Sequence, residues 1–410
     1  MATQYLNLHI PPADPAFSLM ADFEADPHPS KVSLVAGAYR DENGNPWVLP
    51  SVRKAKESLS ETTHEYLGIA GSPTFIDLAK ELIFGPILPR LQGNTASIQT
   101  VSGTGANHLA AMFLARHLRP THVFLPAQTW INHRSIWEMA GVPVAEYTYY
   151  SSATKTVDFS GMLSTLDTAE VNDVVILQAC AHNPTGVDLS QSQWMQLADL
   201  VRRKHLFVVF DSAYQGFATA DIDGDAWAVR HFAENLLASE SKTHPGMCVA
   251  QSFPKNFGLY GERVGALHLV VPPHLSAQGA RGALMAIARA EYSNPPRFGA
   301  RIVELVLGDL DSRAQWERDL GTMSLRIRTM RRELRRRLEG ETGQDWSHLE
   351  TQIGMFSYTG LDKEQVARLR DEFHVYMLPS GRISVCGLNE GNVQYVAHAI
   401  GQVVKPHTSK

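Results

Sequence analysis

The 410-residue sequence is poor in the features that mark several specialised classes of protein. It contains only three cysteines, Cys180, Cys248 and Cys386, which are odd in number, far apart and set in or beside apolar runs. They fit buried, reduced thiols better than a disulfide framework. There is no CxxC motif and no paired Cys/His spacing, and the seventeen histidines are scattered, so no metal site is predicted.

The sequence also lacks a long apolar run and an excess of basic charge. No window approaches the length needed to span a bilayer, and residues 1–15 show neither the apolar core of a signal peptide nor the Arg-rich pattern of a transit peptide. The net charge of −5 gives no electrostatic reason to expect nucleic acid or an anionic membrane as a partner. Basic residues cluster from Arg326 to Arg337, but apolar residues are interleaved at helical spacing, which favours a solvated helix face. We therefore expect a cytoplasmic protein.

Length and composition indicate an ordinary globular protein with more than one domain. Hydrophobic residues make up 44% of the chain and charged residues 19%, and both values are typical. At 410 residues the chain is too long for one compact core, so two domains are the default expectation.

From residue 97 the sequence alternates between strand-like and helix-like segments. This alternation predicts an α/β fold whose large, mainly parallel sheet lies between layers of helices, plus a smaller α/β domain. Expected strands cover 98–101, 123–125, 174–178, 206–210 and 246–253, with 264–271 as a further candidate, and expected helices cover 106–118, 132–140 and 191–204. Ahead of this region, residues 32–40 are expected to form a short strand broken by a glycine. A long polar-faced helix over 312–339 is followed by expected strands over 355–358 and 374–377 and expected helices over 362–373 and 392–404.

One lysine stands at the end of an apolar, strand-like run. Lys255 is flanked by Phe253, Phe257 and Leu259, and this desolvation would lower its pKa and expose the neutral amine. Such an amine condenses with an aldehyde, and pyridoxal phosphate is the natural one; its phosphate would need a cation such as Arg263. The alternative is an ordinary loop lysine and arginine.

Other expected strands also end in polar residues, and open parallel sheets bind ligands at the carboxyl ends of their strands. The segment Ser102-Gly103-Thr104-Gly105 is interpreted as a tight turn opening a helix, where free N–H groups and hydroxyls could hold a phosphate. The motif lacks the third small residue of the dinucleotide fingerprint, and no clear ribose-binding acid follows it. NAD binding is therefore not favoured.

Asp211 ends a strand rich in valine and phenylalanine, where an unpaired carboxylate would be costly. A protonated pyridine nitrogen would supply the missing partner and make the ring an electron sink. Asn183 and Tyr214 could donate hydrogen bonds to a ring oxygen, and Trp130 could stack on the ring face. The alternatives are a helix N-cap for Asp211 and a core position for Trp130.

Taken together, these residues resemble the aspartate aminotransferases, which are fold-type I pyridoxal phosphate enzymes. The resemblance runs from about Asn7 to the C-terminal helix. It is carried by Tyr39-Arg40, Trp47-Val-Leu-Pro50, Glu65-Tyr66-Leu67, Gly103-Thr-Gly105, Trp130-Ile-Asn-His133, Ala179-Cys-Ala-His-Asn183-Pro-Thr-Gly186, Phe210-Asp-Ser-Ala-Tyr-Gln-Gly-Phe217, Lys255-Asn-Phe-Gly-Leu-Tyr260, Ser293-Asn-Pro-Pro296 and Pro379-Ser-Gly-Arg382.

The resemblance implies a role for each of these residues at the cofactor. Lys255 would be the Schiff-base lysine and the acid/base of the proton transfer, and Asp211, supported by His133, would pair with the ring nitrogen. The other implied contacts are Asn183 and Tyr214 at the ring oxygen, Trp130 on the ring face, Ser102, Gly103, Thr104, Ser252 and Arg263 at the phosphate, and Tyr66 reaching in from a second subunit. No metal is implied.

The resemblance also implies the substrate contacts and the domain plan. Arg382 would bind the α-carboxylate as a bidentate fork, which lysine cannot reproduce. Arg289 would cross the interface of a homodimer to the side-chain carboxylate, which favours a dicarboxylic substrate; Gly37, Asn183 and Trp130 complete the implied set. The implied plan is an N-terminal arm (1–14), a large cofactor domain (46–311) with the seven-stranded type of sheet of fold-type I enzymes, and a small domain (15–45 and 312–410).

Four residues depart from the family pattern near the implied site. Pro254 stands where a serine is usual, Val35 adds a side chain to a glycine-rich strand, and Gln178 stands where histidine is common. Glu291 brings a negative charge near the implied carboxylate pocket, where it would repel a dicarboxylate, pair with Arg289, or point away without effect.

The sequence thus predicts transamination from L-aspartate, or another dicarboxylic amino acid, to 2-oxoglutarate. The alternatives are a specialised enzyme of the same type that acts on a different amino acid in a biosynthetic pathway, and a non-catalytic homologue kept for binding.

Overall fold

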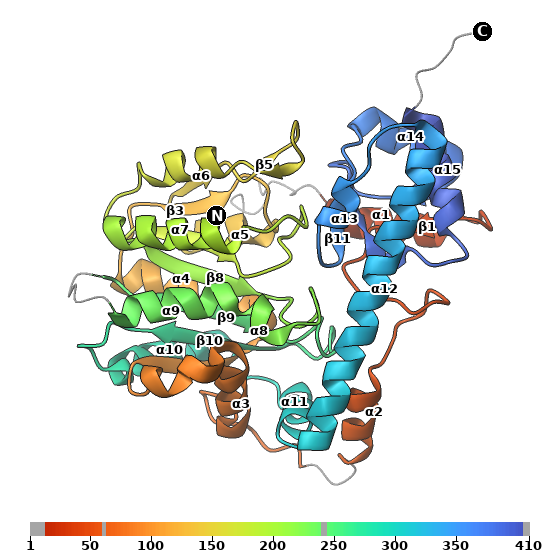
Figure 1. The fold of residues 1–410 in the computed structure, drawn as a ribbon. Helices are drawn as coiled ribbons and strands as arrows, with labels where there is room; N and C mark the ends of the chain where they lie inside the picture. The colour runs from red at the N-terminus through yellow and green to blue at the C-terminus, as the bar shows by residue number, and fades with distance from the viewer. Residues whose placement is uncertain (1–12, 60–62, 239–243, 405–410) are drawn as a thin grey trace, which may run out of the picture.

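The computed structural model describes residues 13–59, 63–238 and 244–404. Residues 1–12, which make up most of the predicted N-terminal arm, lie outside the described residues. A larger α/β body and a smaller body stand beside one another, and the long helix α12 (Leu310–Thr342) runs past both of them (Figure 1). Among the described helices, none is long and apolar enough to cross a membrane. All three cysteines are buried and unpaired.

The larger body is built on a seven-stranded sheet with the strand order β2-β10-β9-β8-β7-β3-β4. The strands are β2 (Thr95–Val101), β3 (Val123–Pro126), β4 (Val144–Tyr147), β7 (Val174–Gln178), β8 (Phe207–Ser212), β9 (Met247–Ser252) and β10 (Val264–Val270). Only β10 runs antiparallel to its neighbours, β2 and β9. The predicted mainly parallel α/β sheet is confirmed.

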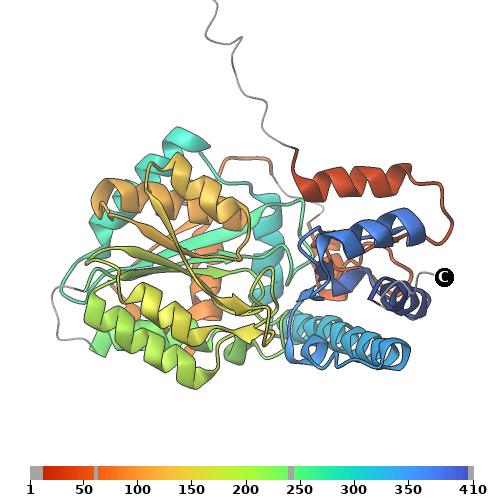
Figure 2. The ribbon, with the colours of Figure 1, turned by 90° about the horizontal axis from the view of Figure 1, so that it is seen from above.

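Helices cover both faces of this sheet (Figure 2). One face packs against α4 (Ser102–His117), α5 (Asn132–Met139) and α10 (Ala277–Glu291), and the other against α6 (Phe159–Leu166), α7 (Gln191–Lys204) and α9 (Trp227–Ala238). Because side chains alternate along a strand, Val174 and Ile176 face the first layer and Val175 and Leu177 the second.

The same alternation decides where the polar strand ends point. Phe207 and Val209 of β8 and Cys248 and Ala250 of β9 belong to the α4/α5/α10 layer. Two residues further along their strands, Asp211 and Ser252 take the same face, and Gln178 does so in β7. Three neighbouring strands therefore present polar side chains at one edge of one face of the sheet.

The smaller body joins residues from both ends of the chain. β1 (Val32–Ser33) pairs in parallel with β12 (Val375–Tyr376), and β11 (Phe356–Tyr358) pairs antiparallel with β13 (Arg382–Ser384). Its helices are α1 (Pro15–Ala25), α13 (His348–Thr351), α14 (Lys363–Phe373) and α15 (Val393–Val404), with the 3₁₀ turn η3 (Val385–Gly387). The proposed domain boundaries, 46–311 against 15–45 with 312–410, stay a prediction.

The remaining elements connect the two bodies or edge the sheet. They are α2 (Pro50–Glu57), α3 (Pro73–Phe84), the 3₁₀ helix η2 (Gly85–Leu91), β5 (Tyr150–Ser151), β6 (Thr156–Val157), α8 (Ile222–Asp225) and α11 (Phe298–Leu307). Proline stands at the first helical position of α2 and α3, as its fixed φ favours. Capping boxes begin α7 and α14, where Ser190 and Asp362 accept from the backbone and a glutamine three residues on returns the bond.

Two local predictions were wrong. The expected strand near residues 32–40 is only two residues long, because β12 offers a ladder of the same length and the chain then bends toward β13. The expected turn at Ser102 to Gly105 is already the first turn of α4. Its glycines suggested a loop, but packing of the helix against β9 and β10 overrides their low helix propensity.

A buried arginine on α12 holds the backbone that leads into β11. The Arg331 guanidinium is 2% exposed and donates to the carbonyl oxygens of Leu349 (2.9 Å), Gly354 (2.8 Å) and Phe356 (2.6 Å). No carboxylate among the described residues pairs with it, and burial lowers its pKa to about 10. These carbonyls have few other donors, so Arg331 substitutes for secondary structure in this segment.

Replacing Arg331 with methionine would leave several buried carbonyls without donors. We expect Arg331→Met to lower the free energy of unfolding by roughly 3 kcal/mol, measured by urea denaturation. The matched control is Arg335→Met, one turn further along α12, where the arginine makes partly exposed ion pairs with Glu339 and Glu350. The control should change the stability by about 1 kcal/mol or less; equal losses in the two variants would contradict the role given to Arg331.

Candidate active site

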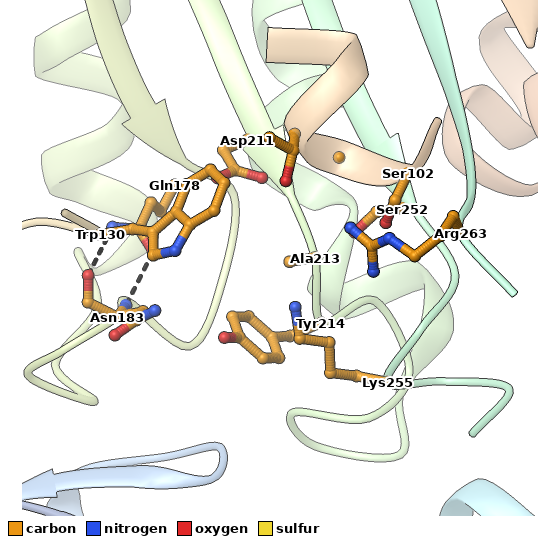
Figure 3. A pocket seen from close by; sticks show the side chains of 12 residues that line it. Ser102, Trp130, Gln178, Asn183, Asp211, Ala213, Tyr214, Ser252, Lys255 and Arg263 are labelled. Atoms are coloured by element: carbon orange, nitrogen blue, oxygen red, sulfur yellow. Dashed lines mark hydrogen bonds between the residues drawn. The ribbon is translucent and has the colours of Figure 1, made fainter. Parts of the chain in front are cut away.

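A cavity opens at the polar edge of the sheet, beside the N-terminus of α4 (Figure 3). Its walls come from segments far apart in the sequence: α4, the β3–α5 loop, and the ends of β7, β8, β9 and the approach to β10. The lining residues are Ser102, Gly103, Thr104, Trp130, Gln178, Asn183, Asp211, Ala213, Tyr214, Ser252, Lys255 and Arg263. Ten of these twelve were expected from the sequence; Gln178 was noted only as a departure, and Ala213 was missed.

One end of the cavity is shaped by a close crossing of two backbone segments. Ser102 and Arg263 both have left-handed backbone, with φ of 59° and 55°, and the Ser102 N–H donates to the Arg263 carbonyl at 3.1 Å. A Cβ at Gly265 would lie 2.6 Å from the Ser102 carbonyl carbon, so only glycine permits the crossing. Unfavourable backbone of this kind is retained where surrounding structure enforces it, often at functional sites.

This end carries the groups of an anion site. The Ser102 N–H is used by the Arg263 carbonyl, but no side chain among the described residues caps the start of α4, so the N–H groups that follow Ser102 remain available to a ligand. The Ser102 and Ser252 side chains and the Arg263 guanidinium point toward the same space (Figure 3). Arg263 donates to the Tyr260 carbonyl at 2.9 Å and pairs with no carboxylate among the described residues, and burial lowers its pKa.

A buried carboxylate marks the opposite wall. Asp211 is 9% exposed, and its Oδ2 lies 2.9 Å from Nε2 of His133, which is 1% exposed. Nδ1 of the same ring lies 2.8 Å from the Thr129 hydroxyl. The carboxylate accepts, so the imidazole carries its proton on Nε2 and supports the negative charge of Asp211. The helix N-cap alternative for Asp211 is wrong, because Asp211 lies within β8.

The Lys255 amine lies between these two ends. Burial lowers the pKa of Lys255, the Asp211 carboxylate opposes this, and the Arg263 guanidinium lowers the pKa further. The turn that carries the lysine is fixed from behind: Trp316 of α12 donates to the Asn256 carbonyl at 2.7 Å, and its ring stacks on Phe257. A rigid turn and a lowered pKa suit a nucleophilic amine.

Aromatic and amide groups complete the cavity. The Tyr214 ring lies 5.3 Å from the Lys255 amine, and burial, with the Asp211 charge, raises the pKa of its phenol. Gln178 forms two hydrogen bonds with the backbone of Asn183, which are the dashed lines in Figure 3. Trp130 is half-buried and lines the cavity.

Arg382 lies outside the lining of this cavity, on β13 of the smaller body. Its guanidinium sits 4.1 Å from the centroid of the Phe356 ring and donates to the Val35 carbonyl at 2.8 Å, while its buried Nε has no partner among the described atoms. Burial lowers its pKa. A Cβ at Gly37 would lie 3.0 Å from the same phenyl ring, so the glycine lets Phe356 support the arginine.

Tyr66 and Arg289 are not brought to this cavity. They line a separate, open hollow together with His64, Glu65, Leu67, Tyr292, Ser293, Asn294, Pro295 and Arg297. Tyr66 is 87% exposed, and Arg289 is also exposed and donates to the Ser293 hydroxyl. Their predicted service to a second subunit stays a prediction.

The departures from the family pattern fall in distinct places. The Glu291 carboxylate lies 3.1 Å from Nε2 of His108 on α4 rather than beside Arg289. Val35 is buried with Leu19 and Tyr376, and Pro254 is buried in the turn before Lys255. Only Gln178 reaches the cavity.

The donor set fits pyridoxal phosphate. A guanidinium that pairs with no carboxylate in the described parts of the chain, two hydroxyls and a helix start without a side-chain cap match a phosphate at one end of the cavity. A buried carboxylate matches a protonated ring nitrogen at the other, and a desolvated amine stands between them to meet an aldehyde. The residues present would therefore hold this cofactor without rearrangement of charge.

The pKa of Lys255 can be measured in cofactor-free protein by the pH dependence of its acetylation, read by mass spectrometry. We expect the midpoint to lie below the ordinary lysine value of 10.5. Asp211→Asn removes the charge that opposes this shift, so it should lower the midpoint further. Exposed Lys56, followed in the same digests, is the control and should not differ between the two proteins; a higher Lys255 midpoint in Asp211→Asn would contradict the electrostatic account.

Comparison with known proteins places the chain in a family. The family model described as aminotransferase class I and II matches residues 29–400. The L-tyrosine:2-oxoglutarate aminotransferase ucdG of Aspergillus ustus is 45% identical over 405 residues, covering 95% of this chain and 76% of that protein. The mitochondrial aspartate aminotransferase of Dictyostelium discoideum is 41% identical over 406 residues, covering 98% of this chain and 93% of that protein.

Among solved structures, the aspartate aminotransferase from Saccharomyces cerevisiae cytoplasm matches with a TM-score of 0.94 and 42% identity, over 98% of this chain and 99% of that one. The fold-type I architecture expected from the sequence is confirmed. Family model, relatives and structure agree over nearly the whole chain, so this protein belongs to the class I and II aminotransferases and is a pyridoxal-phosphate-dependent enzyme.

Proposed function

We propose that the enzyme transfers the amino group of a dicarboxylic L-amino acid, L-aspartate in the first place, to 2-oxoglutarate, giving oxaloacetate and L-glutamate. The observation that carries this proposal is the pair of arginines without carboxylate partners among the described residues, Arg382 against Phe356 and Arg289 on the exposed hollow. Each would bind one carboxylate of the substrate.

Pyridoxal phosphate, when bound, supplies the aldehyde that carries the amino group and the ring that takes up the electrons of the broken Cα–H bond. The Lys255 amine would take the proton from the substrate Cα, and the burial that lowers its pKa favours the neutral amine that this role needs. Asp211 would keep a proton on the ring nitrogen. Ser102, Ser252 and Arg263 would hold the phosphate, and Asn183 and Tyr214 would bind the ring oxygen.

Arg382 would fix the substrate by its α-carboxylate. Its planar guanidinium matches a carboxylate in two places, and its contact with Phe356 and the Val35 carbonyl fixes the direction of approach. A buried cation of this kind is costly unless an anion arrives. Substrate binding would therefore relieve an unfavourable charge in the smaller body.

A second candidate is an aromatic amino donor, L-tyrosine. The relative that is 45% identical is named an L-tyrosine:2-oxoglutarate aminotransferase, and that supports an enzyme of the same type with a different amino donor. The acceptor, 2-oxoglutarate, is common to both candidates.

The two candidates are separated by adding each amino acid to the purified, cofactor-loaded enzyme without an oxo acid. We expect L-aspartate to change the visible absorbance of the bound cofactor completely, at lower concentrations than L-tyrosine does. Alanine in place of Lys255 should abolish the change, because it removes the proton carrier. A response to L-tyrosine alone would replace the first candidate by the second.

Arg289 determines the preference for a second carboxylate under the proposal. Arg289→Ala should lower kcat/KM for L-aspartate by about 100-fold, the value of a charge-assisted pair, and leave kcat/KM for L-tyrosine within a few-fold. Arg281→Ala is the matched control, because Arg281 is exposed on the same helix but does not line the hollow. Equal losses for both substrates would show that Arg289 does not read the side chain.

We propose that the enzyme is a homodimer whose subunits complete each other's sites, with Tyr66 and Arg289 supplied by the partner. Their exposure on a hollow away from Lys255 supports this arrangement. The Arg289→Ala enzyme and the Lys255→Ala enzyme should each be nearly inactive toward L-aspartate. Mixing and refolding the two should return part of the activity, because one site of a mixed dimer then has both Lys255 and Arg289. No recovery, in mixtures shown to form mixed dimers, would contradict shared sites.

The cytoplasmic location stays a prediction, since the yeast relative is named as cytoplasmic and the Dictyostelium one as mitochondrial.

A further inference from the structure

A chain of hydrogen bonds runs behind the cavity and joins its two sides. Gln178, the last residue of β7, accepts from the Asn183 N–H at 2.7 Å through Oε1 and donates to the Asn183 carbonyl at 2.8 Å through Nε2. The same Nε2 lies 3.4 Å from the Thr129 hydroxyl. Thr129 contacts His133, and His133 contacts Asp211.

The donors and acceptors in this chain allow only one direction for a neutral imidazole. The Asn183 N–H can only donate, so Oε1 of Gln178 is its acceptor and Nε2 must be the donor to Asn183 and Thr129. At the other end the Asp211 carboxylate accepts from His133 Nε2, so Nδ1 accepts from the Thr129 hydroxyl. The Thr129 hydroxyl thus donates a hydrogen bond to His133 and accepts one from Gln178.

The sheet register brings the two ends together. Gln178 and Asp211 are direct partners in the parallel β7–β8 pair, and both point to the α4/α5 face. Gln178 is 7% exposed and lines the cavity. One amide thus contacts the segment that presents Asn183 and, through two side chains, the carboxylate on the neighbouring strand.

We propose that Gln178 is a positioning residue that sets both Asn183 and Asp211 toward the cofactor. It clamps the Asn183 backbone as a neighbouring strand would, and it orients the Thr129 hydroxyl so that His133 keeps its proton on Nε2 and supports the Asp211 charge. Asparagine and aspartate act on opposite parts of the cofactor ring, so a single uncharged amide tunes both. The inference rests on the proposed cofactor contacts of these two residues.

The first experiment replaces the amide with a side chain of similar length and no hydrogen bonds. In cofactor-loaded Gln178→Met, the pH midpoint of the visible absorbance should rise by roughly 0.5 to 1 unit, the size that one hydrogen bond sets. The midpoint should rise because Asn183, once its backbone is less firmly held, stabilises the ionised form of the ring oxygen less. Gln128→Met is the matched control, since Gln128 lines a different cavity, and its midpoint should equal that of the unaltered enzyme.

The second experiment separates the two arms. Thr129→Val removes the link to His133 and leaves the clamp on Asn183. In a double-mutant cycle with Gln178→Met, the two shifts should add to more than the shift of the double variant, because part of the Gln178 effect passes through Thr129. Strict additivity would overturn the link to Asp211 and leave only the clamp.

A merely structural role would give a different result. It would lower the thermal midpoint of cofactor-free Gln178→Met while the absorbance midpoint of the loaded protein stayed unchanged, and that outcome would overturn the proposal. The titration needs bound cofactor but no amino acid. If L-aspartate and L-tyrosine both failed as substrates, the proposed function would fail while this test still gave its answer.

Discussion

The rest of the structure depends on three charged groups held close together at the end of a sheet: the carboxylate of Asp211 and the basic side chains of Lys255 and Arg263. The Asp211 carboxylate raises the pKa of Lys255, while burial and the Arg263 guanidinium lower it. Removing such groups from water is costly unless each has a partner in a fixed place. The chemistry therefore requires a rigid scaffold here, because in a loose one water or other side chains would pair with these charged groups.

The scaffold meets this requirement by crossing segments that are distant in sequence. Ser102 and Arg263 take left-handed backbone so that the start of α4 and the approach to β10 can touch, and Gly265 makes room for the contact. Trp316 of α12 holds the turn after Lys255 from the far side. The long helix that links the two bodies is thus also the support of the lysine turn, and any shift of α12 relative to the sheet would be felt there.

The chemistry of the site could be predicted from the sequence more fully than its construction. Lys255 and Asp211 were found because an apolar strand that ends in a charged residue is a local signal. The antiparallel direction of β10 could not be predicted, since alternating side chains look alike in parallel and antiparallel strands. The links from Gln178 to Thr129 and from Thr129 to His133 depend on register between β7 and the β3–α5 loop, which no local pattern encodes. The early start of α4 was missed because two glycines indicate a turn until tertiary packing is known.

Lys255 and Arg289 line different cavities, and under the proposed roles this separation would let one family hold relatives named for aspartate and for tyrosine. Proton transfer and the α-carboxylate contact are the same for every amino acid, and the groups proposed for them, Lys255, Asp211 and Arg382, are buried or half-buried and tied to the core. Under the proposal the side-chain end is read by Arg289, which stands on an exposed hollow and carries none of the cofactor contacts. Substitutions there leave the buried charges undisturbed. Specificity can therefore change at little cost to the fold, whereas a change at Asp211 or Arg263 would disturb the charge balance on which the lysine depends.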